Sequence, residues 1–293
     1  MPTIWRVWEY EPDYLCFIAK ESNVNVRMNS DGQSAPSVSL EYSTDGSTWN
    51  DFIVGTTVVT LVNVGDKVRF RAGPSGNSGM ASGLNGINKF RTSGRFSVEG
   101  NIMSLLDPTL ELAAITQSYA FRNLFSGNAG IENVSGLVLP ATTLAEYCYS
   151  NMFREIPITS MPQIRATTTA RNCCWYMFAG CTSLVNVSSL PATTLDNDCY
   201  DNMFYNCTSL TTAPELPATT LAQGCYSGMF RSCTSLNSIK IGYTGNFSGS
   251  GVPIWAFNGW VDGVASTGTF YYNGSDTTEG VNAIPTGWTI QTF

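Results

Sequence analysis

The cysteines are the first residues of this chain whose type and spacing could do chemistry. Most of them form two ladders at nearly regular intervals, Cys148, Cys173, Cys199 and Cys225 in one and Cys181, Cys207 and Cys233 in the other. Such ladders can form disulfides, ligate a metal ion or fill a narrow core as small apolar side chains. Disulfides favour an even count, and metal sites favour Cys-x-x-Cys pairs or histidine partners. The chain has nine cysteines, no Cys-x-x-Cys pair and no histidine, so we expect buried, reduced thiols with no metal and no cofactor.

A second candidate site is aromatic. Tyr149, Tyr200 and Tyr226 recur at one repeat position, and Trp175 lies in the unit between the first two. Aromatic rings at fixed repeat positions can hold sugar rings, so these four residues are the candidate ligand-binding residues. The alternative is packing in the core, because Tyr226 falls in the same apolar arc of a helical wheel as Met229. The pattern favours packing and leaves the sugar platform as the competing interpretation.

Acid–base catalysis finds little support. The absence of histidine removes the commonest general base and every Ser-His or Cys-His nucleophile pair. The 22 Asp and Glu residues are scattered, and no spacing marks a glycosidase pair. We therefore expect no enzymatic activity and no catalytic residue. Charged residues make up only 13% of the chain, the net charge is −7 and no basic run exists, which disfavours a nucleic-acid partner. No apolar stretch is long enough to insert in a membrane.

The candidate residues are positioned by a repeat. One motif ends successively at Phe125, Phe153, Phe178, Phe204 and Phe230, with intervals of 28, 25, 26 and 26 residues. This period falls in the range of leucine-rich repeats, and about five units are enough to bury a continuous core. Within a unit, a short extended segment precedes the turn "LPATTL". The segment after the turn, for example "TLAQGCYSGMFRSC", carries apolar residues four apart and predicts a short helix.

Start signals accompany the predicted helices. In the capping box, a threonine and an acidic or amide residue three positions later satisfy each other's free N–H groups. The matching pairs are Thr143 with Glu146, Thr220 with Gln223 and, more weakly, Thr194 with Asn197. Each unit is therefore expected to contain an extended segment, a turn and a short helix.

The repeat resembles the BspA-like leucine-rich repeat of Bacteroides-type surface proteins and of the phages that infect those bacteria. The resemblance is carried by "LPATTLDNDCYDNMFYNCTSLTTAPELPATTLAQGCYSGMFRSCTSL" at 190–236 and extends over about 115–240. It implies an α/β leucine-rich-repeat solenoid. The unit at 153–178 departs from the pattern because it lacks the first cysteine and has Thr169 where a leucine belongs.

The flanks have a different sequence pattern. Short alternating segments such as "IWRVWEY" and "KVRFRA" predict strands, and "LEYSTDGSTWNDF" predicts a hairpin that turns at Asp45-Gly46. The fold class is therefore multidomain. It comprises an all-β N-terminal sandwich (1–106), a short α/β leucine-rich-repeat solenoid (107–240) and a small β C-terminal cap (241–293). The segment "NIMSLLDP" at 101–108 is the expected junction, with helical and apolar character.

These features favour a non-enzymatic virion surface protein of a phage, either a capsid fibre or decoration protein or a tail-associated adhesin. The family resemblance implies this role, and the N-terminus lacks the basic and apolar segments of a secretory signal. Expected partners are other virion proteins, a host-surface glycan or receptor, and further copies of the chain. The expected location is the virion surface, after folding in host cytoplasm. The alternative is a bacterial cell-surface leucine-rich-repeat adhesin.

Overall fold

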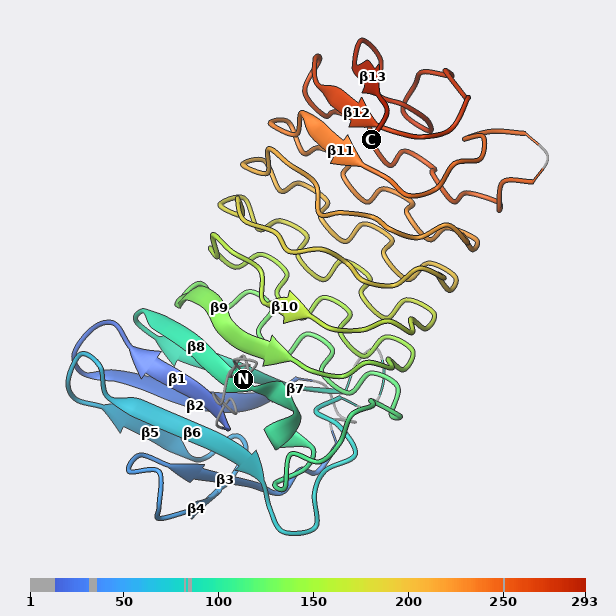
Figure 1. The fold of residues 1–293 in the computed structure, drawn as a ribbon. Coiled ribbons are helices and arrows are strands. Elements are labelled where there is room, and N and C mark those ends of the chain that lie inside the picture. The colour runs from blue at the N-terminus through green and yellow to red at the C-terminus, as the bar shows by residue number, and fades with distance from the viewer. Residues whose placement is uncertain (1–13, 32–35, 82, 84–85, 250) are drawn as a thin grey trace, which may run out of the picture.

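The computed structural model describes residues 14–31, 36–81, 83, 86–249 and 251–293. An N-terminal β-sheet region supports a stack of coils that rises toward the C-terminus (Figure 1). One apolar core runs through both parts, from Leu15 to Trp288. The predicted strand "IWRVWEY" lies outside the described residues.

Two sheets face each other in the N-terminal region. Five antiparallel strands of the first follow the order β8 (Phe96–Asn101), β1 (Leu15–Ala19), β6 (Lys67–Ala72), β3 (Leu40–Ser43) and β4 (Asn50–Phe52). The second has the order β5 (Val58–Leu61), β2 (Val24–Asp31) and β7 (Ile87–Ser93). Phe90 of β7 lies 4.9 Å from Phe17 of β1 and 4.9 Å from Phe70 of β6, measured between ring centroids. Aromatic packing thus joins the two sheets.

The hairpin and the junction agree with the sequence pattern. Strands β3 and β4 pair antiparallel, and Gly46 adopts the positive φ of +82° that the turn between them requires. The Asp45 carboxylate accepts hydrogen bonds from the backbone N–H groups of Ser47 and Thr48 at 2.8 and 2.7 Å. At the junction, a single 3₁₀ turn, η1 (Ile102–Leu105), is buried along its whole length.

The first sheet continues into the stack. Strand β9 (Ile131–Leu139) pairs parallel with β8, and β10 (Gln163–Ile164) pairs parallel with β9. At the other end, β11 (Ser238–Lys240), β12 (Thr269–Tyr271) and β13 (Thr289–Gln291) form a parallel sheet. Between these sheets, single bridges such as Thr212 to Ser238 link successive coils. Hydrogen bonds therefore cross residue 106, where the sequence suggested a boundary.

The prediction of an α/β leucine-rich-repeat solenoid is wrong. The described residues contain no α-helix, and the segments expected to be helical are runs of turns. The threonines of the expected capping boxes do not begin helices either. Thr143 instead bridges to Thr168, and Thr194 to Thr220, so they join one coil to the next.

A four-residue backbone cycle takes the place of the helix. In one coil Asp198, Asn202 and Asn206 all have positive φ, at 53°, 52° and 58°. Tyr205 N–H bonds within the coil to the Asn202 carbonyl at 3.0 Å, whereas Asn202 N–H bonds to the Ser227 carbonyl of the next coil at 2.8 Å. Along the coil, the N–H groups therefore bond in alternation to a carbonyl of the same coil and to a carbonyl of the next coil. Buried backbone groups are paired in this way without a helix.

This cycle recurs in six coils. We call coils 1 to 6 the segments 118–127, 146–155, 171–180, 197–206, 223–232 and 254–263. The sixth lies in the region expected to be a separate cap, where Trp255, Gly259 and Gly263 have positive φ of 59°, 59° and 78°. A cycle of four places apolar residues at i and i+4, as a helix does, and this shared spacing explains the wrong prediction.

Gly228 provides a test of the cycle. Its φ is +57°, and a Cβ there would lie 2.3 Å from Asn202 Oδ1. We expect Gly228→Ala to lower the free energy of unfolding by about 1–2 kcal/mol. A helix would give the opposite sign, because alanine stabilises a helix interior by roughly 1 kcal/mol over glycine. Urea unfolding measures the change. Gly127→Ala is the control, since Gly127 also has positive φ but no atom within 4 Å of a Cβ. It should lose less stability than Gly228→Ala.

Candidate functional site

The four-residue cycle sorts side chains into two inward and two outward positions. In coil 4, Cys199 and Tyr200 are buried, Asp201 and Asn202 are part-exposed, and the pattern then repeats. The outward residues of coils 1 to 6 together form one surface, which we call the turn face. Because most backbone N–H groups of coils 1 to 5 bond to carbonyls of the same or the next coil, the turn face there meets a ligand mainly through side chains.

An aromatic row crosses the turn face. Tyr119 of coil 1 stacks on Tyr147 of coil 2 at 4.9 Å and 10°. Tyr147 meets Trp175 of coil 3 edge-on at 6.4 Å, and Trp175 meets Tyr176 at 5.0 Å. Tyr176 then lies 6.1 Å from Tyr205 of coil 4. All five side chains are part-exposed or, for Tyr205, 37% exposed. The row therefore offers a ligand a continuous series of rings over four coils.

Asp201 is the most perturbed carboxyl beside this row. Burial, reinforced by the nearby charge of Asp198, raises its pKa to about 6. The Asn202 amide donates a hydrogen bond to the carboxylate, and nearby polar groups of Ser227 and Trp175 also favour its ionised form, but together they offset burial only in part. Asp201 thus lies near Trp175 and among polar groups of coils 4 and 5, and its carboxyl is ionised at neutral pH.

A polar hollow of about 430 Å³ adjoins the aromatic row on the turn face. Arg231 Nε lies 3.3 Å from Asp262 Oδ2 in its lining, and Asn282 Oδ1 accepts the Gly259 N–H at 2.6 Å. The other lining residues are Tyr176, Asn202, Ser227, Gly228, Asn258 and Val281. Amide, hydroxyl, carboxylate and guanidinium groups are therefore displayed together beside an aromatic ring.

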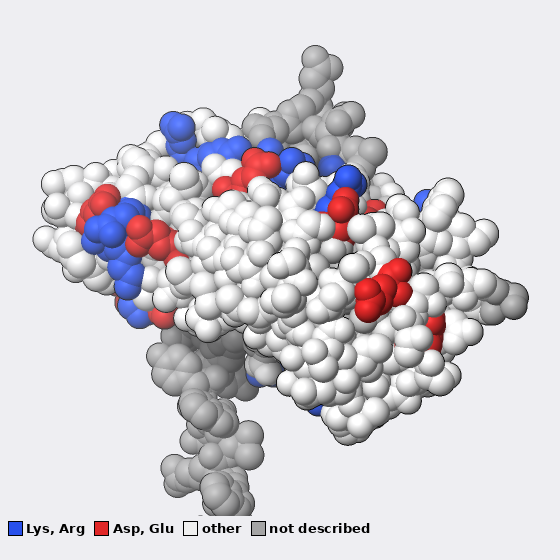
Figure 2. All heavy atoms as spheres, turned by 90° about the horizontal axis from the view of Figure 1, so that it is seen from above, with Lys and Arg blue, Asp and Glu red and all other residues white. Residues whose placement is uncertain are grey.

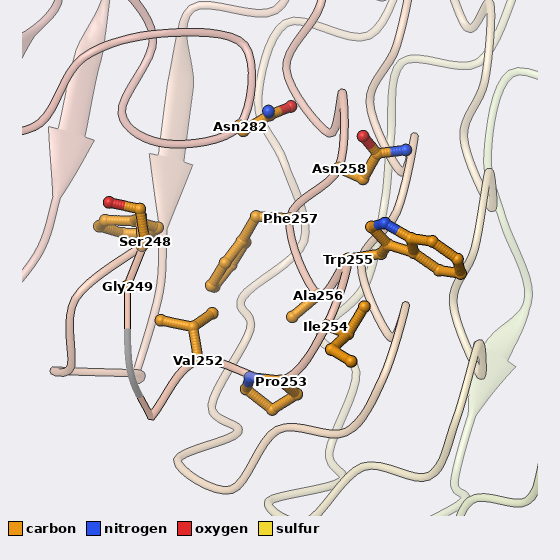
Figure 3. A pocket seen from close by; sticks show the side chains of 11 residues that line it. Ser248, Gly249, Val252, Pro253, Ile254, Trp255, Ala256, Phe257, Asn258 and Asn282 are labelled. Carbon is orange, nitrogen blue, oxygen red and sulfur yellow. The ribbon is translucent and has the colours of Figure 1, made fainter.

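A second hollow, of about 340 Å³, lies at the C-terminal end of the stack. Figure 3 shows Trp255 and Phe257 on opposite sides of their segment. Trp255 is 65% exposed, whereas Phe257 is buried in the core. The lining contains Val252, Pro253 and Ile254 but no titratable side chain, so this hollow can make apolar contacts and not acid–base chemistry.

The structure separates the four predicted ligand-binding residues. Tyr149, Tyr200 and Tyr226 are 0%, 2% and 1% exposed, which confirms the core-packing interpretation and closes these rings to a sugar. Only Trp175 is part-exposed. The sugar-platform interpretation is thus wrong for the three tyrosines, because their inward positions in the cycle point them into the stack.

Sequence reasoning missed the tyrosines that flank Trp175 on the turn face. They are Tyr119, Tyr147, Tyr176 and Tyr205. A signal was available in the repeat, since pairs such as Cys199-Tyr200 and Met203-Phe204 recur four residues apart with two polar residues between them. Two apolar residues followed by two polar ones indicate a cycle of four, while a helix would drift from that spacing.

The predicted burial of the cysteines is confirmed for the eight repeat thiols, which are free in the structure. Burial raises the pKa of Cys181 and of Cys233 to about 12, so these thiols stay protonated. Cys181 Sγ donates to the Phe153 carbonyl of the preceding coil at 3.0 Å, and Cys233 Sγ to that of Phe204 at 3.0 Å. Each fills the core and satisfies a backbone acceptor.

Within the described part of the chain, no group of three or more His, Cys, Asp or Glu side chains is arranged to hold a metal ion. Nor is any helix in that part long and apolar enough to cross a bilayer. No family model, curated protein or solved structure matches this chain.

The raised pKa of Asp201 predicts a pH effect on stability. Because burial favours the neutral acid, the stabilisation is complete below the ordinary pKa of 3.8 and is lost as pH rises through about 6. We expect stability to rise by about 1–2 kcal/mol between pH 7 and pH 4 from this group, after solvent screening. Asp201→Asn should gain that amount at pH 7 and flatten the profile, measured by urea unfolding.

A matched carboxyl serves as the control for this pH effect. Asp51 lies exposed on β4, away from the stack. Asp51→Asn should change stability by less than about 0.5 kcal/mol at any pH, as for most surface substitutions. If Asp201→Asn were destabilising at pH 7 by more than that, its carboxylate would be a net stabilising group, contrary to the burial argument.

Proposed function

We propose that this chain is a non-enzymatic attachment protein on the surface of a phage virion and that its turn face holds a ligand of the host surface. The aromatic row from Tyr119 to Tyr205 carries the proposal. Part-exposed rings in contact with one another over four coils, beside a hollow with mixed polar groups, are typical of a recognition surface.

The arrangement of carboxyl groups supports binding over hydrolysis. Asp198 and Asp201 lie three residues apart on one coil, so both belong to the same outward surface. A glycosidase needs two carboxyl groups that face each other across the scissile bond. Asp201 is moreover hydrogen-bonded by the Asn202 amide, as expected of a binding residue held in place.

The virion location is supported by the resemblance of the repeats to phage proteins and by the reduced thiols, which suit folding in a reducing cytoplasm. Uncharged residues cover most of the C-terminal end of the stack, with Lys, Arg, Asp and Glu in a few small groups (Figure 2). Such a surface suits contact through polar and aromatic groups. Many copies on one particle would make individually weak contacts strong.

Attachment is tested by adding the purified protein to host cells before infection. The wild type should bind the cells and compete with phage adsorption, and Trp175→Ala combined with Tyr176→Ala should lose both effects. Val185→Ala, an exposed residue outside the turn face, is the matched control and should act as the wild type. Equal binding by the double variant would refute the role of the turn face.

The location is tested separately by mass spectrometry of purified particles. Peptides of this chain in stoichiometric amount are the expected result. Their absence from particles, together with their presence on bacterial cells, would contradict the virion location and leave the attachment role standing.

A further inference from the structure

We infer that the turn face binds an extended, uncharged oligosaccharide, which lies along the stack from Tyr119 to Tyr205 and places its hydroxyl groups against Asp201 and Asn202. This inference rests on the proposed attachment function and names the chemical class of its ligand. Four features of the turn face support it: the spacing of the aromatic rings, the hydrogen-bonded backbone N–H groups, the polar side chains beside the row and the charged side chains along it.

The spacing of the row matches a chain of sugar rings. Successive rings from Tyr119 through Tyr147, Trp175 and Tyr176 to Tyr205 are 4.9 to 6.4 Å apart. The coils themselves repeat at the strand spacing of about 4.8 Å. A pyranose unit advances an extended oligosaccharide by a similar length, so one sugar can meet each coil. Tyr119 and Tyr147 cover each other's faces and present ring edges, so the apolar C–H face of a sugar packs best near Trp175, whose ring lies nearly perpendicular to those of Tyr147 and Tyr176.

The backbone of the turn face disfavours an extended peptide as the ligand. A peptide that adds to a protein as a strand needs free backbone N–H and C=O groups at an edge. In coils 1 to 4 most backbone N–H groups already bond to carbonyls of the same or the next coil. For example, Tyr147 N–H bonds to the Arg171 carbonyl at 3.1 Å and Tyr176 N–H to that of Asp201 at 3.1 Å. A ligand recognised by side chains alone fits this surface better.

The polar groups beside the row suit hydroxyls. A hydroxyl both donates and accepts, so it is best held where acceptors and donors lie together. The Asp201 carboxylate accepts, the Asn202 amide does both, and the Ser227 hydroxyl does both, all next to Tyr176. Adjacent hydroxyl groups of one sugar can therefore bridge coils 4 and 5.

The charges along the row disfavour an anionic sugar. Arg154 pairs with Glu155 at 2.9 Å and also lies over the Tyr176 ring at 5.7 Å. The charge of Arg171 acts on Asp198, whose pKa burial nonetheless raises. Arg231 likewise pairs with Asp262, which leaves Arg171 against the carboxyls of Asp198 and Asp201, so the middle of the row has no excess of positive charge to hold an anionic sugar.

The inference is tested by calorimetry on the full chain. The probes are neutral gluco-, manno- and galacto-oligosaccharides of two to six units, with sialylated and sulfated oligosaccharides for comparison. We expect at least one neutral series to bind, with affinity that rises about tenfold from two to four units and then levels off as the row is filled. Anionic probes should bind at least tenfold more weakly.

Substitutions in the aromatic row test whether the oligosaccharide binds there. Trp175→Ala and Tyr205→Ala should each lower the affinity for the best neutral probe about tenfold. Trp175→Phe should recover part of it, and Val185→Ala should leave it unchanged. Thermal unfolding of each variant separates lost binding from lost folding. Tyr205 is the safer site, since its side chain is 37% exposed.

The outcomes distinguish this inference from the proposed function. If the protein blocks phage adsorption but binds only anionic probes, or if periodate oxidation of the cells leaves its binding intact, the oligosaccharide inference fails and the attachment role remains. If neutral oligosaccharides bind but host cells do not, the attachment role fails instead. Cleavage of a probe during the titration would overturn both, since binding without catalysis is assumed in each.

Discussion

Replacing Phe204 with alanine is expected to lower the free energy of unfolding by about 3–5 kcal/mol. Phe204 is fully buried in a column of rings, 5.6 Å from Phe178 and 5.8 Å from Phe230, with interplanar angles of 8° and 11°. Neighbouring coils hold the rings on both sides, so the cavity cannot collapse readily. Urea unfolding followed by tryptophan fluorescence measures the loss.

Two substitutions control this result. Phe204→Leu keeps most of the side-chain volume and should lose clearly less than Phe204→Ala. Tyr205→Ala changes the next residue, which points outward, and should cost under about 1 kcal/mol. If Phe204→Ala lowered the free energy of unfolding by less than about 1 kcal/mol, the column of stacked Phe rings would not be a main source of the stability of the core.

The second large effect is expected at Trp260, which closes the C-terminal end. Its ring is fully buried, 5.0 Å from Phe257, 6.1 Å from Phe230 and 6.2 Å from Phe247. Its Nε1–H donates to the Ala283 carbonyl at 2.7 Å. Trp260→Ala should cost about 3–5 kcal/mol of unfolding free energy and expose apolar surface at the end of the stack. Urea unfolding and light scattering measure the two consequences.

The hydrogen bond and the ring are separated by a milder change. Trp260→Phe keeps an aromatic ring and removes the donor, so it should cost about 1–2 kcal/mol without self-association. If Trp260→Ala left both stability and light scattering unchanged, the aromatic cluster around it would not be the closure of the stack.

Much of the stack could be predicted from its residues. The intervals between Phe125, Phe153 and Phe178 gave the repeat, and the nine cysteines without histidine or Cys-x-x-Cys pairs indicated buried thiols. Both inferences depend on which side chains prefer an apolar interior. The turn at Asp45-Gly46 was equally accessible, because glycine there adopts a φ that other residues avoid.

The candidate site could be predicted only in part. The candidate Trp175 is part-exposed on the turn face, whereas the candidates Tyr149 and Tyr200 are buried and the unselected Tyr147 and Tyr176 lie outside. A helical wheel placed Tyr226, the counterpart of Tyr149 and Tyr200, correctly among the apolar residues, but a period of 3.6 did not reveal an outer face that contains Tyr147 and Tyr176. With a period of four, the same sequence places Tyr147 and Tyr176 on the outer face of the stack.

The sequence by itself determined the period of the repeat, the apolar columns of Phe and Cys side chains, and the low surface charge. These properties depend on composition and spacing, which a chain carries whether or not it is folded. Only the tertiary structure decided between helix and turns, because apolar residues four apart satisfy both. Hydrogen bonds between coils, such as Tyr200 N–H to the Cys225 carbonyl at 3.1 Å, stabilise the turns, and they join residues a whole repeat apart. The aromatic row exists for the same reason, since its rings become neighbours only when the coils stack.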